Sequence, residues 1–241
     1  MSICSKLGKY LVSNTNYPFA KNSFAMNFQK ITGILIVSFF ASFSIRILGT
    51  LFPVIFQYPY IAKTAIISHS FFALMQLLFF GYFISYAKYR QASLKAAGLL
   101  AIIGSSAIFL IYIINFDLVF DINILPQFLQ NRYVNASIPL MSSLLLLLFF
   151  STYKFELTND ELIQLNHPIL SAIIGVCIFF VLHLAAVINR MGCQKFDQST
   201  QIPPIVSVFT LLFIVLAASL ILIFYVKFYH FLSMLDKNGK E

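Results

Sequence analysis

The chain has 241 residues, of which 60% are hydrophobic and only 10% are charged, and its mean hydropathy is +0.88. Because a water-soluble domain carries roughly a quarter of its residues as charged side chains, this composition excludes a soluble fold. The net charge of +8 does not indicate nucleic-acid binding, since most basic residues flank apolar runs, where they determine membrane orientation.

The first 29 residues are polar and basic and lack the apolar core of a cleavable signal peptide. We therefore expect residues 1–29 to form a cytoplasmic N-terminal leader. The first membrane span is expected at about residues 31–56 and contains Arg46, with small and polar residues at helical spacing from it. This pattern predicts that Arg46 lies on an inward-facing side of its helix.

The second span is expected at about residues 61–88, where His69 and Gln76 share a helix face with several alanines. That face is also expected to point inward, because polar side chains avoid lipid. Basic residues follow, and they separate this span from a third one at about residues 96–115, in which small residues permit close helix contact.

The longest connection between spans, residues 116–135, is predicted to form a short interfacial helix. The fifth span carries His183 in a stripe of small residues at three- and four-residue steps, and Arg190 continues that stripe. The fourth, fifth and sixth spans are expected at about residues 136–152, 168–189 and 203–226, respectively.

The predicted fold class is therefore an all-α integral membrane protein, a single-domain bundle of about six transmembrane helices over residues 30–235 with a cytoplasmic tail at 236–241. With the amino terminus inside, eleven Lys and Arg residues fall on the cytoplasmic side and four on the other, with Arg46 within a span. This bias favours cytoplasmic termini. The expected location is a bacterial inner membrane.

Three of the polar residues within the predicted spans are expected to lie at similar depths in the membrane. At about 1.5 Å per helical residue, Arg46 and His183 each lie roughly 22 Å from the cytoplasmic boundary, and His69 lies roughly 18 Å from it. We therefore predict one polar site in the outer half of the bilayer, built from Arg46, His69 and His183. Gln76 extends this site toward the membrane centre, and Arg190 lies near its outer edge. Structural roles are the alternative, since arginine can reach the interface and histidine can bond a neighbouring helix.

Three functions fit such a site. Our first interpretation is binding of a small molecule or carrier-type transport, which predicts a colourless protein whose activity depends on Arg46. The second is haem b held by His69 and His183, which predicts visible absorbance. The third is a non-catalytic scaffold or assembly subunit. The expected partners are the lipid bilayer and a small ligand or another membrane protein, without nucleic acid.

An enzyme is not favoured, because no pair of nucleophile and base can be named. The three cysteines show no zinc-type spacing, so no metal site beyond the haem alternative is expected.

Overall fold

The computed structural model describes residues 22–52, 59–87, 92–120, 132–192 and 204–238, and these residues are helical almost throughout, with no strand among them. The helices are α2 (Asn22–Leu51), α3 (Pro59–Tyr86), α4 (Ala92–Phe120), α5 (Arg132–Phe155), α6 (Asn159–Gly192) and α7 (Pro204–Asn238). The predicted all-α class is confirmed for this part of the chain.

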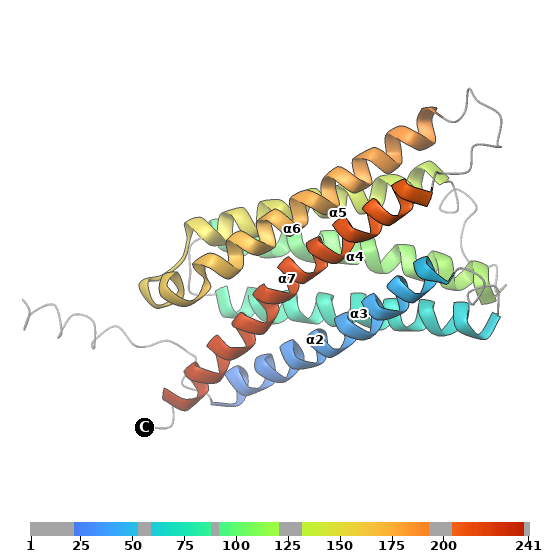
Figure 1. The fold of residues 1–241 in the computed structure, drawn as a ribbon. Coiled ribbons are helices and arrows are strands. Elements are labelled where there is room, and N and C mark those ends of the chain that lie inside the picture. Colours follow the sequence, from blue (N-terminus) through green and yellow to red (C-terminus); the bar gives the residue numbers. More distant parts are fainter. Residues whose placement is uncertain (1–21, 53–58, 88–91, 121–131, 193–203, 239–241) are drawn as a thin grey trace, which may run out of the picture.

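The six helices of the described residues form a closed ring. Each helix contacts the next along the chain, and α2 contacts α7 to complete the ring. In such a ring, α3 and α6 lie on opposite sides. We call the end at which α2 begins and α7 ends the terminal end, and the opposite end the far end (Figure 1).

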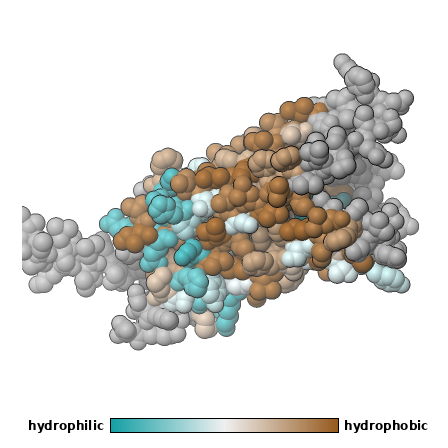
Figure 2. Space-filling model, in the orientation of Figure 1, coloured by the Kyte–Doolittle hydropathy of each residue, from teal (hydrophilic) through white to brown (hydrophobic). Residues whose placement is uncertain are grey.

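All six helices are long and apolar enough to cross a membrane. Large apolar side chains cover their outer surfaces, among them Val37, Ile103, Val181 and Leu212, each more than half exposed. The face shown in Figure 2 is apolar across its middle, and hydrophilic residues gather at the terminal end. A surface that is apolar around the middle and polar at an end suits a protein embedded in a bilayer. These features support an integral membrane protein.

The helices extend beyond the spans expected from hydropathy. α2 begins at Asn22, inside the predicted leader, because Ala25 and Phe28 are buried against the other helices. α6 begins at Asn159, so Pro168 lies inside the helix and does not begin it. The predicted interfacial helix falls partly on α4, which runs to Phe120, and partly outside the described residues.

An aromatic cluster fills the bundle in the half nearer the terminal end. Its rings come from α2, α3, α5 and α7, and none of the side chains is more than 7% exposed. Many of the rings meet edge to face, as do Phe83 and Phe149, whose centroids are 4.9 Å apart. The cluster therefore leaves no open path along the bundle axis at its level. Its members are Phe28, Phe79, Phe80, Phe83, Tyr86, Phe149, Phe150, Tyr153, Phe224, Tyr225 and Phe228.

The buried carboxylate of Glu161 ties three parts of the terminal end together. It accepts hydrogen bonds from the Tyr86 hydroxyl of α3 and from the Tyr153 hydroxyl of α5, the latter at 3.1 Å. It also accepts bonds from the backbone N–H and the hydroxyl of Thr158, at 2.9 and 2.8 Å. Thr158 precedes α6 and Glu161 stands three residues later, the spacing of a capping box. This end of the bundle is therefore fixed by polar contacts as well as by ring contacts.

Candidate functional site

A cavity of about 450 Å³ lies inside the ring, in the half of the bundle nearer the far end. All six helices contribute to its wall. On five of them the first and last lining residues are seven residues apart, or about 10 Å along the helix. Its apolar wall includes Phe43, Phe72 and Phe179. Its polar wall consists of Ser42, Arg46, His69, Gln76, Tyr112, Asn115, Ser143, His183 and Tyr225.

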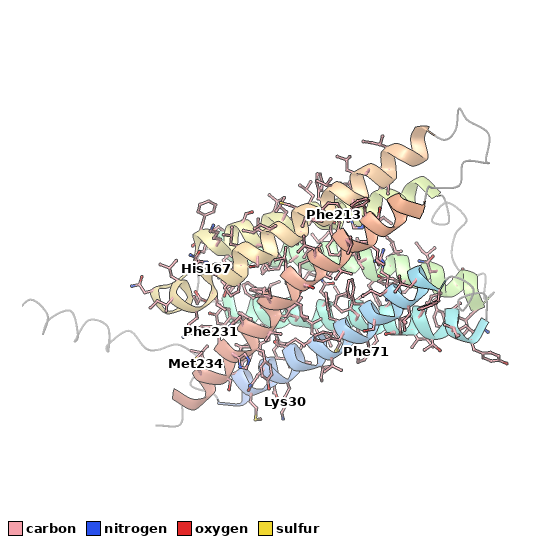
Figure 3. The ribbon with its side chains drawn as sticks, viewed as in Figure 1. Lys30, Phe71, His167, Phe213, Phe231 and Met234 are labelled. Atoms are coloured by element: carbon pink, nitrogen blue, oxygen red, sulfur yellow. The ribbon has the colours of Figure 1, made fainter. Side chains whose placement is uncertain are left out.

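Four of the five predicted site residues line this cavity: Arg46 from α2, His69 and Gln76 from α3, and His183 from α6. The two histidines thus face the cavity from opposite helices of the ring. Arg190 belongs to α6, but its side chain lies outside the described part of the structure. The two other histidines are exposed and distant from the cavity. His167 lies near the terminal end (Figure 3), and His230 is in the last turns of α7.

His69 is held by two contacts with neighbouring helices. Its Nδ1 atom is hydrogen-bonded to the hydroxyl of Ser42 on α2. Its ring also stacks on Tyr112 of α4, with centroids 5.4 Å apart. These contacts fix the orientation of the imidazole against the wall of the cavity.

His183 is held in a corresponding way from α5, and its bonds define a tautomer. Its Nδ1 lies 2.9 Å from the Ser143 hydroxyl, which in turn donates to the Pro139 carbonyl at 2.8 Å. A serine hydroxyl has one proton. Because that proton goes to Pro139, Ser143 accepts the second bond, and Nδ1 of His183 donates it. In the neutral ring, Nε2 is therefore an acceptor without a proton.

Gln76 lies seven residues further from the far end than His69, at the inner part of the cavity. Its side chain is only 5% exposed, and Tyr225 of α7 lines the same cavity. The Oε1 atom, in contrast, is buried and has no hydrogen-bond partner within the described structure. A buried acceptor without a partner is costly, so this atom is a point where a bound molecule can be recognised.

Arg46 is the only charged side chain among the described residues that line the cavity. It is exposed, and it is the α2 lining residue nearest the far end. The cavity therefore has a cationic group on its far-end side, polar and apolar groups along its length and the aromatic cluster beneath it.

The described residues contain no group of three or more His, Cys, Asp or Glu side chains that could hold a metal ion. His69 and His183 can together supply two nitrogen ligands. A metal bound there would need its other positions filled by the ligand itself, as a porphyrin does. The donor set thus fits haem but not a metal site made of protein side chains alone.

Sequence reasoning missed the serines and tyrosines that hold these groups. The roles of Ser42, Ser143, Tyr112 and Tyr225 were not predicted. Their signal in the sequence is weak, because a serine or threonine inside a helix commonly bonds its own backbone, as Thr32 does to the Phe28 carbonyl. The contacts between helices are needed to show which serines and tyrosines face a histidine.

Over the described residues, the fold and the site define an all-α protein with six helices suited to a membrane, arranged around a cavity with both polar and apolar walls. No model of a known protein family matches the chain, and searches of curated proteins and of solved structures also give no match.

Proposed function

We propose that this protein binds a small amphipathic molecule with an anionic group in the cavity between its helices. The observation that carries the proposal is that Arg46 is the only charged side chain among the described lining residues, with apolar and neutral polar groups behind it. A volume of about 450 Å³ lies within the range of small-molecule sites. Such a site favours a negatively charged ligand.

The wall of the cavity suits each part of such a molecule. The guanidinium of Arg46 is a planar donor that matches carboxylate and phosphate groups. The rings of Phe43, Phe72 and Phe179 offer an apolar surface to the body of the ligand. Both histidines, held in place by Ser42 and Ser143, add polar groups whose orientation is set before the ligand arrives. Such preorganisation lowers the entropy lost on binding.

Transport of the same ligand would require one further step. The aromatic cluster closes the bundle beneath the cavity, so a carrier would have to separate these rings in a second conformation. Binding needs no such change, and it is therefore the function that we propose. Haem is the second candidate, because Nδ1 of each histidine is engaged by a serine and metal-ligating histidines characteristically use their second nitrogen in this way.

The proposal is tested by comparing 2-naphthoate with its neutral analogue 2-naphthamide on protein in lipid nanodiscs. The chain contains no tryptophan, so naphthalene fluorescence reports binding without interference from indole. We expect Arg46→Gln to weaken binding of naphthoate by about tenfold or more, the value of a hydrogen bond to a charged group. Binding of the amide should stay unchanged, because it makes no ion pair.

Lys227→Gln is the matched control, because Lys227 is an exposed cation on α7 that does not line the cavity. It should leave both affinities as they are. The purified protein is first checked for visible absorbance, since haem would occupy the same space. The proposal is contradicted if naphthoate binds no better to the protein than to empty nanodiscs, or if Arg46→Gln weakens the acid and the amide equally.

A further inference from the structure

Two hydrogen-bond acceptors in the cavity wall indicate a second chemical group that the ligand needs besides the anion that Arg46 favours. They are Nε2 of His183 and Oε1 of Gln76. The Ser143 and Pro139 bonds leave Nε2 as an acceptor in the neutral ring. Oε1 is an acceptor by nature, and it has no partner within the described structure. Both atoms are therefore acceptors to which a ligand can donate a hydrogen bond.

The Gln76 acceptor is the more informative of the two. Its residue is almost fully buried in a helix that is suited to a membrane interior, where water is scarce and an unsatisfied polar group is costly. The carbonyl oxygen is the atom of this amide that is buried without a partner in the described structure. The terminal torsion of a glutamine is soft, so the carbonyl can turn to meet a donor placed in the cavity.

The positions of these groups set the order along the ligand. Arg46 is the α2 lining residue nearest the far end, whereas Gln76 lies seven residues, or about 10 Å, further from the far end than His69. A molecule that extends from Arg46 into the cavity thus brings its other end to Gln76. The phenyl rings of Phe43 and Phe72 flank the space between them.

From these observations we infer that the ligand carries a hydroxyl or N–H group at the end opposite its anion, and that Gln76 accepts the hydrogen bond from that group. This inference rests on the proposed function and specifies its substrate class: an amphipathic acid with a polar donor at the far end of an apolar body. His183 offers the second acceptor for the same class of molecule.

The test compares 6-hydroxy-2-naphthoate with 2-naphthoate on the native protein in nanodiscs. The two acids share the charge and the ring and differ only in the donor. We expect the hydroxylated acid to bind about three- to tenfold more tightly, the value of one neutral hydrogen bond. In Gln76→Met this preference should disappear, so that the variant binds the two acids equally; thermal unfolding of the variant in detergent shows that it is folded.

Gln164→Met is the matched control. Gln164 also has a buried Oε1 without a partner in the described structure, but it does not line the cavity. Its substitution should leave the preference intact. Equal binding of the two acids by the native protein would overturn the inference and leave the proposed function standing. A preference that persists in Gln76→Met would overturn the role of Gln76. If the native protein does not bind 2-naphthoate at all, the proposed function itself is contradicted.

Discussion

At the scale of single residues, Glu161 does the most to hold the terminal end together. Its side chain is 1% exposed and accepts four hydrogen bonds, two of them from tyrosines of other helices. A buried carboxylate is tolerated only when its oxygens are satisfied in this way. The residue therefore acts as a structural link between α3, α5 and the start of α6, and it lies beyond the cavity wall.

Glu161→Gln is expected to lower the stability of the protein by about 1–3 kcal/mol, because the amide nitrogen cannot accept the bonds that the lost oxygen accepted. Thermal unfolding in detergent checks this expectation. Glu156→Gln is the control, since Glu156 is only partly buried and receives its hydrogen bond from Ser93 at an exposed position. Equal stabilities of the two variants would mean that the four bonds contribute little.

Residue-level reasoning from the sequence brought Arg46, His69, Gln76 and His183 to one place, and all four line the cavity. Their role in binding stays a prediction. The pattern was accessible because polar residues are rare within membrane spans and helical periodicity gives the face on which each one lies. The burial of Glu161 was not predicted, since a charge at a span boundary is expected to be solvated. Its burial depends on tyrosines that are distant in the sequence.

At the scale of elements, the closest helix contact involves Gly175, where α6 meets α7. A Cβ atom added there would lie 2.6 Å from the carbonyl oxygen of Ala217. The sequence predicted a stripe of small residues on α6 but not the helix that it meets. Ala172, on the same stripe, is buried, whereas Ala186 is exposed. The stripe thus serves helix contact along only part of its length.

Gly175→Ala should force α6 away from α7 and lower stability by about 1–3 kcal/mol, the usual cost of overfilling a well-packed contact. The same change at Gly81 provides the comparison, because a Cβ there meets nothing within 4 Å. Gly81→Ala should leave the unfolding temperature the same or raise it slightly, as alanine favours helix more than glycine does. An unfolding temperature for Gly175→Ala equal to that of the native protein would contradict this view of the α6 and α7 contact.

Helix existence was predictable at this scale, but helix ends were less so. Hydropathy detects the apolar middle of a span, whereas α2 and α6 begin in polar sequence that is helical because a few of its residues are buried. Hydropathy predicted that the fifth span begins at about Pro168, whereas α6 begins at Asn159. Within α6, Pro168 is accommodated, as prolines in membrane helices can be when neighbouring groups satisfy the freed backbone.

At the scale of the whole molecule, the ring of helices explains why the polar residues share a cavity. The contact between α2 and α7 closes the ring, and it places α3 opposite α6. No sequence signal gave this order, because neighbours along the chain are expected to pair but the first and last helices need not. The aromatic cluster fills the half of the ring nearer the terminal end, and Arg46 lies on the far-end side of the cavity.

The most direct test of the central claim is to locate a ligand in crystals. Crystals of the protein grown from lipid with 6-bromo-2-naphthoate would reveal the bromine by its anomalous scattering. We predict one bromine peak inside the ring, near Phe72 and Gln76, with the carboxylate density beside Arg46. A bromine peak only on the lipid-facing surface, or an empty cavity at a concentration that saturates binding in nanodiscs, would contradict this account.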